Sequence, residues 1–195
     1  THLEFEILKD IKKLTHEETS LLYLIRSKLT NIKTIFIDTA RQVSDEVMLD
    51  VFSSFLWKNE SLQGLTLQYK CSEFLDKSVL YLAENILPSA KSLKNFSISY
   101  SEAEVTATTY NALVESVVQR AENLTDLVFR VNCRYPESET LQKLFVPMPN
   151  LQVFRAKLSS RRFDDATLGV FLRNMRPSLK KLTNFELFID KSTAT

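Results

Sequence analysis

The sequence has very little glycine. It contains 2 glycines in 195 residues, whereas average usage would give roughly 14. Phosphate-binding loops need glycine where the backbone comes close to the phosphate or takes up a positive φ angle. Gly64 and Gly169 are isolated, and neither lies in a G-x-G-x-x-G or G-x-x-x-x-G-K-S/T motif. The scarcity argues against a P-loop or Rossmann nucleotide site, and we expect the protein to use no cofactor.

Histidine is also scarce, since the chain has only His2 and His16. Neither has a cysteine or carboxylate partner at the spacing of a metal site or a catalytic triad. Paired carboxylates such as Asp164 and Asp165 stand at predicted helix starts, where the helix dipole and exposed N–H groups favour acids. We therefore expect no metal site, no catalytic residues and no enzymatic activity.

Long apolar runs and a cysteine framework are missing as well. No run approaches the roughly 18 residues of a membrane span, and the chain opens at Thr1 without the basic and apolar regions of a signal peptide. Two cysteines do not make a disulfide scaffold and fit a reducing compartment. We expect no membrane partner and a cytoplasmic or other intracellular location.

Charge is present in ordinary amounts but is unevenly distributed. Residues 1–127 hold 13 Lys and Arg against 18 Asp and Glu, whereas residues 128–195 hold 12 against 6. The net charge of +1 therefore combines an acidic N-terminal part with a basic C-terminal part. Such an asymmetry is typical of chains with charged partners or of parts of a larger assembly.

What the sequence does contain is a repeat with apolar residues at positions 1, 4 and 6. The first positions are separated by steps of 30, 31, 31, 27 and 31 residues. Phe5 and Ile7 indicate a seventh, truncated copy about one step earlier. The six full matches are Ile32, Ile35 and Ile37; Leu62, Leu65 and Leu67; Leu93, Phe96 and Ile98; Leu124, Leu127 and Phe129; Leu151, Phe154 and Ala156; and Leu182, Phe185 and Leu187. Near-constant spacing of this kind indicates a stacked repeat protein.

Between these copies the apolar period changes from 2 to about 3.6, which predicts helices. The predicted helical stripes run through residues 21–25, 47–56, 79–87, 110–121, 141–145 and 168–175. The segments 44–46, 138–140 and 164–166 carry residues that favour helix starts. Pro88, Pro149 and Pro177 stand where helices are expected to stop. Each unit is therefore predicted to be a short strand, a loop, a helix and a return.

The L-x-x-L-x-L pattern with a 27–31-residue strand–helix period resembles the leucine-rich repeats of the ribonuclease-inhibitor-like class. The resemblance covers essentially residues 1–195 and implies an α/β fold: a right-handed leucine-rich-repeat solenoid with parallel strands on its concave side and helices on its convex side. We expect one domain of about six to seven repeats, as part of a longer chain or assembly. A doubly wound α/β sheet is the competing fold.

Cys71 and Cys133 occupy equivalent places, nine residues after Leu62 and Leu124. They lie two units apart, which corresponds to about 10 Å between neighbouring strands of a sheet. A disulfide needs Cα atoms within about 7 Å. We therefore predict two reduced thiols in half-buried positions, and neither a disulfide nor a metal site.

On each predicted strand the residues between the apolar positions face away from the core, towards the concave surface. Their mixture of apolar, aromatic and charged side chains suits protein recognition. We expect Arg130, Arg155 and Lys157 to share one basic patch that an acidic protein segment would fit. The predicted partner-binding residues are Phe36, Asp38, Gln68, Tyr69, Tyr100, Val128, Arg130, Arg155, Lys157 and Phe188.

These features predict a non-enzymatic protein-interaction or scaffold module that binds another protein on its concave strand face. A second interpretation is that the basic C-terminal half binds a nucleic-acid backbone, in which case binding should fall steeply with salt. A third is an enzyme on an α/β sheet, which needs a constellation of catalytic side chains that the sequence does not display.

Overall fold

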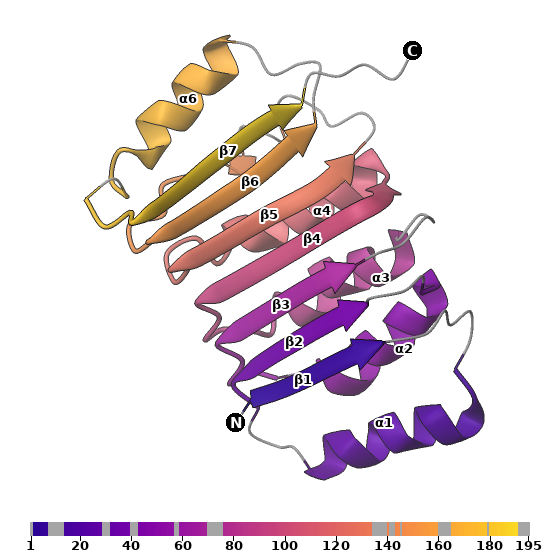
Figure 1. The fold of residues 1–195 in the computed structure, drawn as a ribbon. Coiled ribbons are helices and arrows are strands. Elements are labelled where there is room, and N and C mark those ends of the chain that lie inside the picture. The colour runs from indigo at the N-terminus through magenta and orange to yellow at the C-terminus, as the bar shows by residue number, and fades with distance from the viewer. Residues whose placement is uncertain are drawn as a thin grey trace, which may run out of the picture.

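The computed structural model describes residues 2–7, 14–28, 32–39, 43–56, 59–69, 76–133, 140, 143–144, 146–159, 165–178 and 180–190. Along these residues strands alternate with helices, except that the fifth strand is followed directly by the sixth (Figure 1). The strands are β1 (His2–Ile7), β2 (Thr34–Thr39), β3 (Gly64–Tyr69), β4 (Asn95–Val105), β5 (Asp126–Cys133), β6 (Val153–Ser159) and β7 (Asn184–Asp190). The helices are α1 (His16–Lys28), α2 (Asp45–Phe55), α3 (Asp76–Tyr81), which continues as the π-helical segment η1 (Leu82–Ile86), α4 (Ala107–Val118) and α6 (Asp165–Met175).

The strands form one parallel sheet whose spatial order is the order along the chain, from β1 to β7. A doubly wound sheet instead reverses its strand order at a switch point. The described strands show no such reversal, so the alternation predicted from the sequence belongs to a sequentially ordered α/β sheet. In Figure 1 the helices α2, α3 and α4 lie behind this sheet, and its other face is turned to the viewer.

The start of each unit is tied to the unit before it by main-chain hydrogen bonds. The carbonyl of Lys33 accepts bonds from the N–H groups of Gln63 and Gly64, at 2.6 and 3.0 Å. The same pair of bonds recurs in each following unit. The accepting carbonyls belong to Lys33, Gln63, Lys94, Thr125 and Gln152, and the last one receives the N–H groups of Thr183 and Asn184. The intervals between these junctions are those of the apolar repeat, because each accepting residue directly follows a first repeat position.

The predicted apolar positions form the core between the sheet and the helices. Leu62, Leu65 and Leu67 are fully buried, as are their counterparts in the next three units. The last unit differs, because Phe185 is 48% exposed on β7, the final strand of the sheet. Phe185 still stacks on Phe154 of β6 at a ring-centroid distance of 5.8 Å.

Helix starts are held partly by residues of the neighbouring unit. The N-cap predicted at Ser44 is confirmed, since its hydroxyl accepts a bond from the Val47 N–H. The carboxylate of Asp45 then accepts bonds from the N–H groups of Lys77 and Ser78 at the start of α3, at 2.8 and 2.9 Å. Asp45 therefore satisfies donors of the next helix that have no partner within that helix.

Asp76 repeats this arrangement one unit later, where it accepts from the N–H and the hydroxyl of Thr106, at 2.8 and 3.0 Å. Thr106 is itself the N-cap of α4. The helix start predicted at 164–166 agrees with α6, although Asp164 lies outside the described residues, as does most of segment 138–140.

Two further sequence predictions concern the cysteines and membrane-spanning segments. Cys133 is buried at the end of β5, but Cys71 lies outside the described residues, so the state of the two thiols stays a prediction. None of the helices described here is long and apolar enough to cross a membrane.

Candidate interaction surface

The face of the sheet opposite the helices carries side chains that are half-buried or exposed. On β2 the burial alternates strictly, with Ile35 and Ile37 inside and Phe36 and Asp38 on this outer side. We call it the open face. Because the strands are parallel and paired in register, its residues line up in columns across the sheet. One column contains Glu4, Phe36, Thr66, Ser97, Val128, Arg155 and Glu186, and the next contains Glu6, Asp38, Gln68, Ser99, Arg130, Lys157 and Phe188.

Most of the residues predicted from the sequence for partner binding lie on this open face. They are Phe36, Asp38, Gln68, Val128, Arg130, Arg155, Lys157 and Phe188. Phe188 is 54% exposed, so a large apolar side chain on this face is in contact with water. The alternation of side chains along each strand explains the placement, because every second residue points away from the core.

The prediction that Tyr69 and Tyr100 belong to this exposed set is wrong. Both side chains are only 4% exposed and belong to the hydrophobic core. Tyr69 follows Leu65 and Leu67 at intervals of two residues, so the strand turns it inwards with them. Its ring stacks on that of Tyr100 and meets Phe52 of α2 edge-on.

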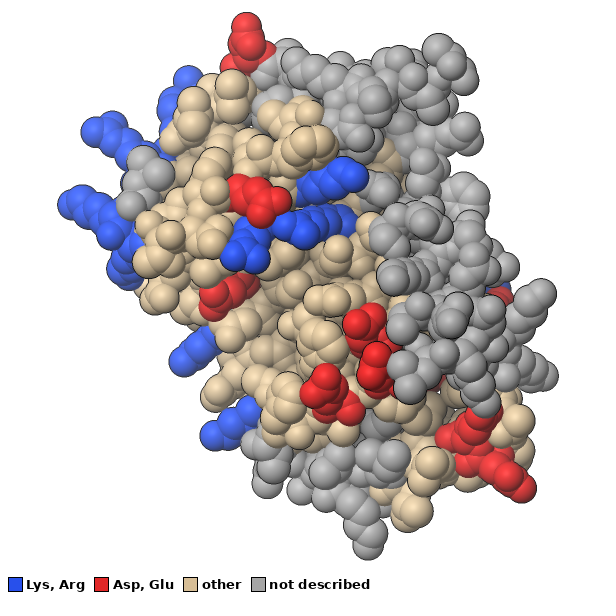
Figure 2. Space-filling model, viewed as in Figure 1, with Lys and Arg blue, Asp and Glu red and all other residues tan. Residues whose placement is uncertain are grey.

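Charge changes sign from one end of the open face to the other. Glu4, Glu6 and Asp38 lie on β1 and β2, whereas the basic side chains lie on β5 and β6. Figure 2 shows acidic side chains gathered over the lower strands and basic ones over the upper strands of this face. The asymmetry seen along the sequence is therefore also an asymmetry in space, and it gives the face a direction.

The basic patch of Arg130, Arg155 and Lys157 is organised by its neighbours on β7. One guanidinium nitrogen of Arg130 donates to both carboxylate oxygens of Glu186, at 2.9 and 3.1 Å. Arg155 donates from Nε to the side-chain oxygen of Asn184 at 3.3 Å, and the Lys157 ammonium lies 5.8 Å from the centre of the Phe188 ring.

Sequence reasoning missed the pairing of Arg130 with Glu186. The two residues are 56 positions apart, and β6 lies between their strands. A signal was present, since Glu186 lies between the apolar positions Phe185 and Leu187 and is therefore expected on the same surface as Arg130. The pair neutralises Arg130 and leaves Arg155 and Lys157 as the cations of the patch that have no acidic partner in an ion pair among the described residues.

Groups with altered acidity lie away from the open face. Burial raises the pKa of the Tyr69 and Tyr110 phenols. On the helical side, the hydrogen bond between Lys77 and Glu46 raises the pKa of Lys77 and lowers that of Glu46. Within the described part of the chain, no group of three or more His, Cys, Asp or Glu side chains is placed to hold a metal ion.

The open face is thus a broad surface with an acidic end, a basic end, the exposed Phe188 ring and the half-buried Phe36 and Val128. Its chemistry suits binding through shape and charge. No protein-family model matches the chain, and no curated protein matches it either. A function can therefore be inferred only from the geometry and charge of the molecule.

Proposed function

We propose that this chain is a leucine-rich-repeat solenoid of about six to seven repeats that binds a partner protein on its open face and catalyses no reaction. Support for the repeat class comes from the main-chain junctions that recur with the apolar pattern. The sequential parallel sheet, with helices on one side, has the layout that such a solenoid requires.

The observation that carries the proposal is the open face itself. All-parallel sheets normally have both faces covered, because the crossover helices lie on them. In the described part of the chain, the outer side chains of every strand on this face are half-buried or exposed, although they include Phe36, Val128 and Phe188. Such a surface is preformed, so a partner binds it without a large cost of ordering the chain.

Charge indicates which partner fits. An acidic segment would meet Arg155 and Lys157, while the Phe188 ring beside Lys157 provides an apolar contact. A nucleic-acid backbone fits less well, because Glu186 neutralises Arg130 and the acidic residues of β1 and β2 repel phosphates. Loss of binding that is steep with salt and independent of the partner's sequence would favour nucleic acid instead.

The test begins with affinity capture of the intact protein and identification of the bound protein. The double variant Arg155→Glu, Lys157→Glu should abolish that complex and leave the far-ultraviolet circular dichroism spectrum unchanged. Arg130 is kept, because changing it would also leave Glu186 without its partner. The control is Arg173→Glu, Arg176→Glu, which makes the same change in charge at exposed positions in and just after α6. If both double variants bind the partner as the parent does, the basic end of the open face is not the contact site.

A further inference from the structure

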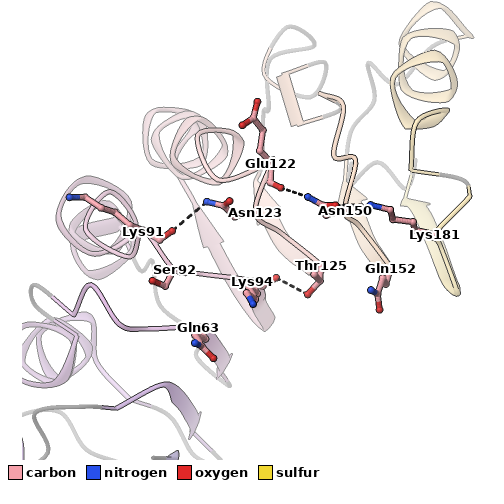
Figure 3. Close-up of a pocket in the computed structure, with 10 residues that line it drawn as sticks. All are labelled: Gln63, Lys91, Ser92, Lys94, Glu122, Asn123, Thr125, Asn150, Gln152 and Lys181. Atoms are coloured by element: carbon pink, nitrogen blue, oxygen red, sulfur yellow. Dashed lines mark hydrogen bonds between the residues drawn. The ribbon is translucent and has the colours of Figure 1, made fainter.

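A recess lies on the edge of the sheet where the strands begin. It has a volume of about 630 Å³ and is lined by residues that directly precede the strands or end the turns before them. Figure 3 shows Gln63, Lys94, Thr125 and Gln152 following one another at the starts of β3, β4, β5 and β6. We call this recess the edge groove. It is separate from the open face, since no residue of the two columns described above lines it.

The main chain along the edge groove is already saturated. The carbonyls of Gln63, Lys94 and Thr125 accept the paired N–H groups of the following units. Side chains from the turns before the strands also link neighbouring units. Asn150 donates to the Glu122 carbonyl at 2.8 Å, and Lys181 donates to the Asn150 side-chain oxygen at 2.7 Å. The walls are therefore fixed from unit to unit, which prepares them for a ligand.

Several polar side chains in the edge groove remain available for a ligand. Within the described residues, the side chains of Gln63, Lys94 and Gln152 make no hydrogen bond or ion pair. The carboxylate oxygen closest to the Lys91 ammonium, from Glu60, is 3.9 Å away, and both side chains are about 70% exposed. Amides offer both donors and acceptors, and lysines offer three donors each.

The edge groove has a positive charge. Of the residues that the structure describes, Lys91, Lys94 and Lys181 line it, against one carboxylate, that of Glu122. Figure 2 shows basic side chains gathered along the edge where the strands begin. A ligand that complements these lysines is acidic, and polar groups on it would match the two amides.

We propose that the edge groove binds an extended acidic peptide running across the strands, with two carboxylates that reach Lys94 and Lys181. The starts of β4 and β7 are three strand spacings apart, or about 14 Å. An extended peptide covers this distance in about four residues, at roughly 3.3 Å per residue. Between its carboxylates, the peptide backbone would exchange hydrogen bonds with the Gln152 amide. Among the described residues, no aromatic side chain lines the groove to stack on a base, which argues for a peptide over a single-stranded nucleic acid.

The probe is a fluorescein-labelled peptide of Gly, Ser and Thr with glutamates at positions i and i+4, and its control has glutamines at both positions. We expect the acidic peptide alone to bind. The double variant Lys94→Gln, Lys181→Gln should weaken its binding roughly fivefold, as expected for two exposed ion pairs. The matched control Arg176→Gln, Lys180→Gln removes the same charge at exposed positions of the turn between α6 and β7 that do not line the groove, and should bind like the parent.

Amide chemical shifts in ¹⁵N–¹H spectra locate the peptide. Changes confined to residues 91–95, 122–126, 150–153 and 181–184 would support the proposal. Changes at Thr66, Val128 and Arg155 would place the peptide on the open face and overturn the edge site. Equal binding of the glutamine peptide, equal binding to the Lys94→Gln, Lys181→Gln variant, or tighter binding of a single-stranded oligonucleotide would also overturn it. None of these outcomes decides whether a protein binds the open face.

Discussion

The rings of Tyr69 and Tyr100 stack inside the core, with their centroids 5.0 Å apart and their planes inclined by 23°. The two residues are register partners on β3 and β4, so the stack links neighbouring units. Burial raises the pKa of Tyr69 well above its ordinary value, and the nearby Tyr100 and Asp45 raise it further. Burial likewise raises the pKa of Tyr110, which meets Phe129 edge-on. The native core therefore requires neutral phenols.

This requirement predicts instability at alkaline pH. In the unfolded chain these phenols lose their protons near pH 10, whereas in the native protein they keep them to higher pH. The buried neutral phenols thus make their full contribution to the free energy of unfolding below about pH 10, and this contribution falls as the pH rises above that value. Each such tyrosine should lower the free energy of unfolding by about 1.4 kcal/mol per pH unit in that range. Urea unfolding at several pH values between 8 and 12 measures the slope.

The variant Tyr69→Phe, Tyr110→Phe is the control for that slope, because lysines also titrate above pH 10. It should unfold with a clearly shallower dependence on pH, and absorbance at 295 nm should show less tyrosinate released on unfolding. The same slope in the parent and in this variant would contradict the argument.

Gly64 should tolerate alanine only when its neighbour on β2 is made smaller. A Cβ atom at Gly64 would lie 3.0 Å from the Thr34 methyl carbon, which is tighter than ordinary contact. We expect Gly64→Ala to cost about 1 kcal/mol. In a Thr34→Ser background the same change should be close to neutral, because the methyl is gone while the hydroxyl that bonds His2 is kept. A double-mutant cycle from urea unfolding measures this coupling, and purely additive effects would refute it.

Asp45 should matter more to stability than its neighbour Glu46. Asp45→Ala removes the acceptor of two N–H groups at the start of α3, so it should cost about 1–3 kcal/mol. Glu46→Ala breaks only an ion pair with Lys77 in which both side chains are more than 60% exposed, so it should have little effect. Thermal unfolding of the two single variants compares them directly. Equal losses would mean that charge near the helix start, and not the specific bonds, carries the effect.

The alternation along β3 predicts opposite outcomes at two adjacent positions. Leu67 is fully buried, whereas Gln68 is on the open face. Leu67→Ala should cost about 2–5 kcal/mol through lost burial and a cavity, and Gln68→Ala should change stability by less than about 0.5 kcal/mol. The midpoint of urea unfolding distinguishes them. A large effect at Gln68 would mean that the strand is turned over or that its outer face is covered.

Much of the fold follows from the sequence because strand and helix periods differ. The positions of Leu62, Leu65 and Leu67 recur with a spacing that only a stack of similar units repeats, and the described strands begin within a few residues of these matches. The same alternation placed Phe36, Arg155 and Phe188 on the open face. The prediction for Tyr69 and Tyr100 was wrong because a pair of aromatic residues in neighbouring units was interpreted as a contact site, although the alternation of each strand continues through it.

Contacts between distant units could not be predicted in the same way. The pairing of Arg130 with Glu186 requires two long side chains to meet above β6, and the reach of Asp45 to the start of α3 depends on how two helices are offset. The edge groove depends on which residues the turns place beside each other, and the turns vary in composition from unit to unit. Periodicity determines which side of a strand a residue occupies, but not which side chains in other units it touches.

The paired hydrogen bonds at the unit junctions have a consequence for how this sequence can change. Since they use main-chain groups alone, they ask of the donating residue only that it is not proline, although at Gly64 a Cβ atom would also meet the Thr34 methyl at 3.0 Å. The edge where the strands begin can therefore exchange its side chains over evolutionary time while the register of the sheet persists. Lys94 and its counterparts Gln63, Thr125 and Gln152 already differ in charge and size at equivalent places.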